Sequence, residues 1–196
     1  MSRPRPWEEE GGDDAKTKKD FLTARDENGI SALLHAAAGG SVGCYRALAK
    51  AWPGGESRAR EEALDGKGRD ALMLAARYGG KEMCRYLLDS GGATGAAAAG
   101  AFDANGESAL FAAIKGGHVE ADGAAEMLFR AYPVHEHKLQ MLEVKNVEGS
   151  TMLLWAAAHG RSEAARWLVS KGADMLATDR KGRLPRRGPS VYSLHM

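Results

Sequence analysis

Cysteine is scarce in this sequence, and long apolar runs are absent. The 196 residues contain two cysteines, Cys44 and Cys84. A disulfide between them is one interpretation, but we favour two buried free thiols in a reducing compartment. No stretch approaches the roughly 18 apolar residues that a membrane-spanning helix needs. We therefore expect an intracellular protein, in the cytoplasm or alternatively in the nucleus.

Neither positive nor negative charge predominates in the sequence. Lysine and arginine number 27 against 26 acidic residues, a formal net charge of +1. This balance argues against a general binder of polyanions. The first 20 residues have no apolar core of a signal peptide, and they are too acidic for a typical transit peptide.

The sequence shows no set of residues that predicts catalysis or metal binding. A catalytic site needs a nucleophile, a base and a stabilising group that converge, and we identify no such set. His135 and His137 have no third or fourth ligand at a recognisable spacing, so we expect no metal. The glycine-rich stretch 91–100 lacks the lysine and hydroxyl residue of a phosphate loop. We expect neither an enzyme nor a cofactor.

One short pattern occurs four times along the chain. Each copy has a glycine, one spacer, a residue type that caps helices, then alanine or methionine, then leucine. The capping residues are Ser31, Asp70, Ser108 and Thr151. Each would accept from a free N–H of the first helical turn, for about 1 kcal/mol. The glycines that should end these helices in a left-handed conformation are Gly40, Gly79, Gly117 and Gly160.

A second helix is expected in each copy, because apolar residues recur there at spacings of three and four. The four copies therefore predict stacked helix–turn–helix units, which is a repeat architecture. We also expect His35, inside a first helix, to be a packing residue. Phe21 and Leu22 are expected to cover the exposed end of the first repeat.

These features together resemble the ankyrin-repeat family. The family's turn-opening acid or amide is matched by Asp26, Asp65, Asp103 and Asn146. His118 follows Gly117 as in the family, and 172–174 reads Gly-Ala-Asp, the family's ending. The family's proline and histidine after the cap are replaced in all four copies. The resemblance implies an all-α solenoid of stacked helix–turn–helix units, here with long inter-repeat insertions.

The resemblance divides the chain into a tail at 1–20, a repeat domain at 21–185 and a tail at 186–196. The repeats are expected at about 26–52, 65–90, 103–132 and 146–174, with a partial fifth start at 179–185. The charged insertion 56–64 is compatible with a helix, whereas 91–99 is a small-residue insertion. The apolar residues of the insertion 135–144 predict that it packs along the second helices.

In this family, partners are met by the turn tips and by the exposed side of the first helices. We call the corresponding surface of this chain the concave face. By position it holds Glu27, Asn28, Ile30, Lys67, Arg69, Arg77, Tyr78, Asn105, Glu107, Lys115, Val147, Glu148 and His159. The second repeat supplies the tyrosine and two arginines, residue types that often anchor protein interfaces. The alternative is a solvated, variable face.

Both tails carry candidate contacts. Trp7 either belongs to a loose tail or anchors that tail in a pocket of this chain or of a partner. The basic residues near the other end are Arg180, Lys181, Arg183, Arg186 and Arg187. They could close the solenoid as a solvated segment, contact an acidic protein surface or nucleic acid, or act as a nuclear-import signal.

The function that the resemblance implies is protein–protein binding without catalysis. The long insertions and the neutral net charge favour a scaffold or accessory subunit of a larger assembly. The alternative is a nuclear or nucleic-acid-associated regulator that uses the basic segment 180–187.

Overall fold

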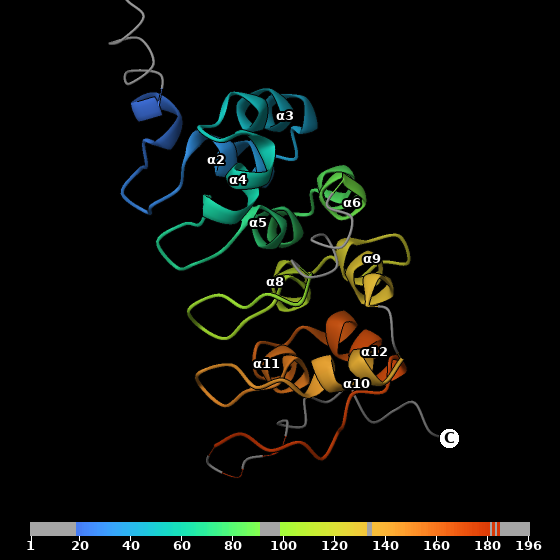
Figure 1. The fold of residues 1–196 in the computed structure, drawn as a ribbon. Coiled ribbons are helices and arrows are strands. Elements are labelled where there is room, and N and C mark those ends of the chain that lie inside the picture. Colours follow the sequence, from blue (N-terminus) through green and yellow to red (C-terminus); the bar gives the residue numbers. More distant parts are fainter. Residues whose placement is uncertain (1–18, 91–98, 133–134, 181, 183, 185–196) are drawn as a thin grey trace, which may run out of the picture.

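The computed structural model describes residues 19–90, 99–132, 135–180, 182 and 184. Helices are stacked in pairs from one end of the molecule to the other (Figure 1). The first helices of the four pairs are α2 (Ala32–Ala38), α5 (Ala71–Tyr78), α8 (Ala109–Gly116) and α11 (Met152–Ala158). Their partners are α3 (Val42–Ala51), α6 (Lys81–Ser90), α9 (Ala124–Ala131) and α12 (Ser162–Ser170). The predicted solenoid is confirmed.

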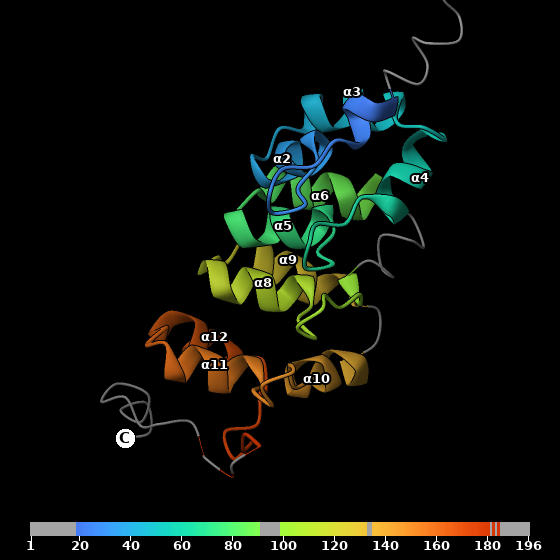
Figure 2. The ribbon, with the colours of Figure 1, turned by 90° about the vertical axis from the view of Figure 1, so that its left-hand side faces the viewer.

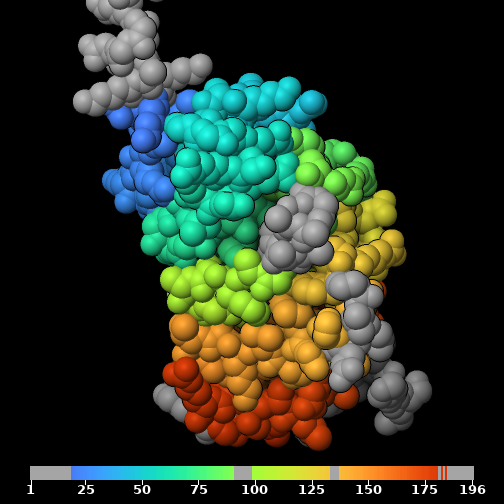
Figure 3. Space-filling model, in the orientation of Figure 1, coloured from blue at the N-terminus to red at the C-terminus, as the bar shows by residue number. Residues whose placement is uncertain are grey.

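Within the described residues, the insertions also contribute the helices α4 (Gly55–Glu62) and α10 (His135–Glu143). Both lie on the same side of the stack, the right-hand side of Figure 2. The first of these insertions was compatible with a helix by sequence, and α4 occupies it. The repeats follow one another in bands along the surface, in chain order (Figure 3).

The predicted caps are present at every first helix. The side chains of Ser31, Asp70, Ser108 and Thr151 accept from the backbone N–H three residues later, at 3.4, 2.8, 3.3 and 3.3 Å. Gly40, Gly79, Gly117 and Gly160 all have positive φ, between 65° and 86°. This left-handed conformation suits glycine, which has no Cβ, so the predicted helix ends are confirmed as well.

An acid or amide side chain organises the turn before each first helix. Asp26 Oδ1 accepts from the N–H groups of Asn28 and Ile30 at 2.9 and 2.8 Å. Asp65, Asp103 and Asn146 make the same pair of bonds in their own turns. A short polar side chain that bonds the backbone two and four residues on fixes the turn by contacts within the turn itself.

Backbone hydrogen bonds join each turn to the next. Gly66 N–H donates to the Asn28 carbonyl at 3.0 Å, Ala104 N–H to Lys67 at 2.9 Å, and Val147 N–H to Asn105 at 2.8 Å. The bonded positions are equivalent in all three pairs. The register of neighbouring turns is therefore set by main-chain atoms, and the side chains at the turn tips are left for other contacts.

The apolar core is deepest in the two middle repeats. In α5 and in α8, six of the eight residues are buried. Their alanines bring these helices close together, and Leu74, Phe111 and Ile114 fill the remaining volume. The outer repeats bury fewer residues of their first helices, since each has one neighbour rather than two.

Several sequence-based expectations are wrong. His35 is not a packing residue: its side chain is 59% exposed, and Nε2 lies 3.0 Å from Asp26 Oδ2. Cys44 is exposed and only Cys84 is buried, although both are free thiols. Phe21 is 75% exposed, so only the half-buried Leu22 packs against the first repeat. The neighbouring elements leave all three side chains exposed to solvent, which the sequence pattern does not predict.

The insertion helix α10 packs differently from the expectation. It contacts the first helix α11 as well as second-helix residues. Leu142 is fully buried, Lys138 Nζ lies 5.7 Å from the centre of the Phe129 ring, and Glu143 Oε1 accepts from the Asp174 N–H at 2.8 Å. The helix therefore joins the third repeat to both ends of the fourth. The small-residue insertion at 91–99 lies outside the described residues except for Ala99, which is buried.

We expect two helical glycines to respond to alanine with opposite signs. A Cβ on Gly116 would overlap the carbonyl oxygen of Arg77 in the preceding repeat, whereas a Cβ on Gly43 meets nothing within 4 Å. Gly116→Ala should lower the free energy of unfolding by about 1–3 kcal/mol. Gly43→Ala should raise it by about 0.5–1 kcal/mol, because alanine favours the helix. Urea unfolding measures both, and stabilisation by Gly116→Ala would contradict the close approach of these repeats.

We expect the cap of α5 to make stability depend on pH. Burial raises the pKa of the Asp70 carboxyl to about 6 from 3.8, against the opposing effect of hydrogen bonds from Met73 and Leu72. The folded state then holds this proton more tightly than the unfolded state, so stability falls as the pH rises from about 4 through 6. Such a shift corresponds to about 3 kcal/mol. Part of Asp70 remains accessible to water, so about 1–2 kcal/mol is expected.

The test is the neutral, isosteric variant Asp70→Asn. It should be more stable than the wild type by about 1–2 kcal/mol at pH 7.5, and the difference should close near pH 4. Urea unfolding across this pH range provides the measurement. A constant difference at all pH values would mean that the Asp70 charge carries no such cost.

Candidate functional site

A small hollow of about 100 Å³ lies between the second and third repeats, on the face that carries the turns. Lys67, Arg69, Met73, Arg77, Asp103, Asn105, Glu107, Ser108, Ala112 and Lys115 line it. Six of these ten residues belong to the predicted concave face. The turns of the two repeats supply one wall, and helices α5 and α8 supply the other.

Arg69 is held in place by the turn in which it lies. Its Nε lies 2.7 Å and a terminal nitrogen 2.6 Å from Asp65 Oδ2, and that carboxylate is fully buried. Burial by itself would raise the pKa of Asp65, but hydrogen bonds from Arg69 and from the Lys67 N–H lower it overall. The guanidinium is therefore a fixed part of the wall.

Lys115 is held in a similar way. Its Nζ bonds both carboxylate oxygens of Glu107, the Oε2 contact being 2.6 Å. The same ammonium lies 5.4 Å from the ring centres of Phe111 and Trp155. Asn146 of the next turn donates to Glu107 Oε1 at 3.3 Å. The third and fourth repeats are thus tied together beneath the concave face by a cation, a buried carboxylate and two aromatic rings.

Lys67 and Arg77 differ from the other cations of the hollow. Their side chains have no hydrogen-bond or ion-pair partner in the part of the chain that the structure describes. Only their backbone atoms are engaged: the Arg77 carbonyl lies 3.2 Å from His118 Nε2, and the Lys67 carbonyl accepts from Ala104. Both charges are therefore available to a binding partner.

The remaining residues of the predicted face extend along the stack. Glu27, Asn28 and Glu148 are exposed at turn tips, and Val147 is 50% exposed. Ile30 is half-buried against the core. Tyr78 is 60% exposed at the end of α5, directly after Arg77.

His159 is exposed at the end of α11 and stacks on Trp155. Their ring centres are 4.1 Å apart at an angle of 18°. Trp155 was not among the residues predicted for the concave face. The repeat pattern could have identified Trp155, because it lies four residues after the cap Thr151, the position that His35 holds in the first repeat. The half-buried indole adds a large aromatic surface beside the hollow.

Four residues that line the hollow were not predicted as site residues: Met73, Asp103, Ser108 and Ala112. Asp103 was assigned only to the turn, where its Oδ1 accepts two backbone N–H groups. Met73 lies three residues after its cap and faces the hollow with its buried side chain. Conversely, Glu107 was predicted as a site residue but is only 8% exposed, and its carboxylate accepts hydrogen bonds from Lys115 and Asn146. Its role in the structure is to fix its neighbours.

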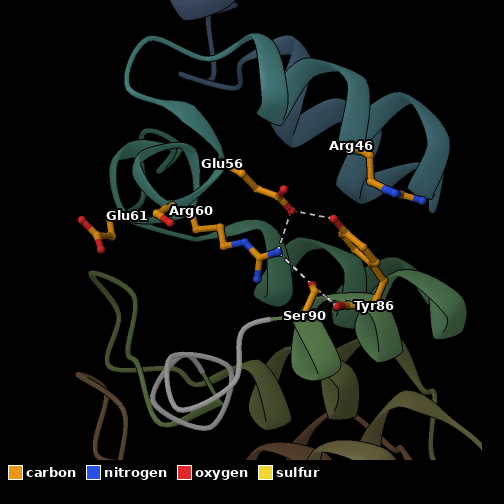
Figure 4. Close-up of a pocket in the computed structure, with 7 residues that line it drawn as sticks. Arg46, Glu56, Arg60, Glu61, Tyr86 and Ser90 are labelled. Atoms are coloured by element: carbon orange, nitrogen blue, oxygen red, sulfur yellow. Dashed lines mark hydrogen bonds and ion pairs between the residues drawn. The ribbon is translucent and has the colours of Figure 1, made fainter.

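A larger hollow of about 490 Å³ lies among α3, α4 and α6 (Figure 4). Its polar groups largely satisfy one another. Glu56 accepts from Tyr86 Oη at 2.6 Å and from Arg60 at 2.8 Å, and Arg60 also donates to Ser90 at 2.8 Å. The hydrogen bonds from Tyr86 and Arg60 hold the pKa of Glu56 below its usual value.

This larger hollow has the volume of a small-molecule site, but its lining differs from that of such a site. Small-molecule sites are lined mainly by apolar side chains, whereas the described residues that line this hollow are charged residues and serines, with Tyr86 as the one aromatic residue among them. The arrangement therefore explains how the insertion helix α4 is attached to the first two repeats, and it indicates no ligand.

The candidate contacts in the tails fall mostly outside the described residues. Trp7, Lys181, Arg183, Arg186 and Arg187 all lie there. Arg180 is described and exposed, and its aliphatic carbons lie directly over Gly149 of the fourth turn. In the described part of the chain, no group of three or more histidine, cysteine or acidic side chains could hold a metal ion. None of the helices described is long and apolar enough to cross a membrane.

We expect a double-mutant cycle to detect the Glu107–Lys115 pair. Glu107→Gln leaves Lys115 partly buried without its counter-ion and should lower the free energy of unfolding by about 1–3 kcal/mol. In a Lys115→Met background the same change should cost less, because the stranded charge is gone and methionine can still pack on the rings. Urea unfolding of the four proteins gives the coupling energy, and strictly additive effects would contradict the pairing.

The comparison with family models agrees with the geometry. A model for ankyrin repeats in three copies matches residues 12–97 and again residues 94–179. The two matches cover most of the chain and include all four helix pairs, their turns and the hollow. The paired helices, the capped turns and these matches together show that the chain belongs to the ankyrin-repeat family.

Proposed function

We propose that this protein is a non-catalytic binding module whose concave face holds a partner protein. Ankyrin repeats generally mediate protein–protein interaction, and this chain carries by position the turn tips and first helices that such a binding surface would use. The observation that carries the proposal is the hollow between the second and third repeats. It brings together six side chains from two repeats, of which Lys67 and Arg77 have no partner within the described residues.

The aromatic groups near the hollow support the same proposal. Tyr78 is largely exposed on one side, and Trp155 presents a half-buried indole stacked on His159 on the other. Tyrosine, tryptophan and arginine supply most of the energy in many protein interfaces, because they bury a large area with few rotatable bonds. These residues would be the anchors, and the exposed turn tips such as Asn28 and Glu148 would form the polar rim.

We infer further that the protein acts as a scaffold or accessory subunit of a larger assembly. The insertion helices α4 and α10 lie on one side of the stack, near its opposite ends, and none of their residues lines the hollow at the concave face. The protein would thus have two surfaces for neighbours, one on the concave face and one over the insertions. The two free thiols fit a reducing compartment, in the cytoplasm or nucleus.

Site-specific photo-crosslinking tests the concave face in cells. A photoreactive phenylalanine at Tyr78 or at His159 should form a covalent adduct with one defined protein. Tyr78→Ala should weaken binding of that protein roughly tenfold or more, since an exposed aromatic anchor contributes 2 kcal/mol or more at many interfaces. Because the side chain is exposed, the midpoint of thermal unfolding should stay unchanged.

The matched controls are the same photoreactive residue at Arg85 on α6 and at Arg166 on α12, which are exposed on second helices. They should not give this adduct. The same adduct from all four positions would indicate non-specific capture. Adducts from the second-helix positions alone would place the partner on the other side of the molecule and contradict the proposal.

A further inference from the structure

The hollow between the second and third repeats contains more positive charge than the neighbouring carboxylates neutralise. Its four cations are Lys67, Arg69, Arg77 and Lys115, and the carboxylates on or behind its walls are Asp65, Asp103 and Glu107. The difference is one positive charge.

The hydrogen bonds show where the excess lies. Asp65 engages Arg69, and Glu107 engages Lys115. Asp103 accepts from two backbone N–H groups through Oδ1 and from the Asn105 amide at 3.3 Å through Oδ2. All three carboxylates therefore have partners of their own. Lys67, from the turn, and Arg77, from the end of α5, line the same hollow with no carboxylate among the described residues.

The size of the hollow limits what can enter it. Its volume of about 100 Å³ is well below the roughly 300–1,000 Å³ typical of sites for small molecules and cofactors. It has room for the end of one side chain, and the buried Met73 and Ala112 can pack against the carbons of that chain. A carboxylate at its tip could bond to both free cations, and arginine can bind it through two parallel bonds.

We propose that the hollow binds an aspartate or glutamate side chain of the partner protein, between Lys67 and Arg77. This inference rests on the proposed function, since it names the chemistry of the segment that the concave face holds. A protein carboxylate fits better than a nucleic acid. Asp103 and Glu107 lie on the same walls and would repel the row of phosphates that a nucleic acid carries, whereas one carboxylate needs only the two cations.

Peptide selection tests this assignment without knowledge of the partner. A random peptide library displayed on phage is selected on the full-length wild-type protein and, in parallel, on Lys67→Gln/Arg77→Gln. The wild-type pool should be enriched in aspartate and glutamate relative to the starting library, and the double variant should remove that enrichment. A selected acidic peptide should bind the double variant roughly five- to tenfold more weakly, because two exposed charge pairs are lost. Higher salt should reduce this difference in peptide affinity between the wild type and the double variant, because salt screens the charges.

The control variant is Lys145→Gln/Arg166→Gln, which removes the same charge from two exposed cations outside the hollow. It should keep the acidic enrichment and bind the selected peptide within about twofold of the wild type. Equal weakening by both double variants would show an effect of net charge and overturn the proposal. Thermal unfolding should be unchanged in both, since none of the four side chains has a partner in the described structure.

The other outcomes separate the two proposals. If the wild type selects peptides that depend on Tyr78 but are not enriched in acids, the carboxylate assignment is wrong and the protein-binding function stands. If the wild type selects no peptide, both are overturned. The remaining outcome is a DNA oligonucleotide that binds the wild type more tightly than the selected peptide does and fails to bind Lys67→Gln/Arg77→Gln. That result would overturn the assignment in favour of a nucleic acid.

Discussion

The structure depends on one hydrogen-bonding arrangement that is used four times. A short acid or amide side chain opens each turn and accepts from the backbone N–H groups two and four residues later. Main-chain bonds then join that turn to the next at equivalent positions. Because the backbone is satisfied within and between the turns, side chains at the turn tips such as Asn28, Lys67 and Glu148 supply no hydrogen bond that the turns require. These side chains can therefore differ from one repeat to the next.

The candidate site follows from this freedom. The second and third turns present Lys67, Arg69, Asn105 and Glu107 at equivalent places, but the residues differ in what they do. Arg69 is fixed by its own turn, and Glu107 fixes Lys115 beneath the Trp155 ring. Lys67 and Arg77 are left without a carboxylate partner among the described residues. Binding chemistry is concentrated where two repeats with different residues meet, on a scaffold that is the same throughout.

The prediction of the fold succeeded because the repeat pattern was redundant. Four capping residues at one offset, each followed by leucine and a terminal glycine, specify the same unit, so an ambiguity in one copy is resolved by the others. The site was predicted less completely. Position within a repeat identified Lys67 and Arg77, but it also included Glu107, which is buried, and it omitted Trp155. Spacing gives the side of a helix, whereas burial at the edge of that side depends on the neighbouring repeat.

The sequence by itself determined the helix pairs, their caps and their order, because these depend on contacts only a few residues apart. Only the tertiary structure decided which charges are neutralised, since Lys115, Glu107 and Asn146 meet across two repeats. It also decided that His35 and Cys44 face solvent and that α10 joins the third repeat to the fourth. Such contacts depend on how adjacent repeats are placed against one another, and no local pattern of residues encodes that placement.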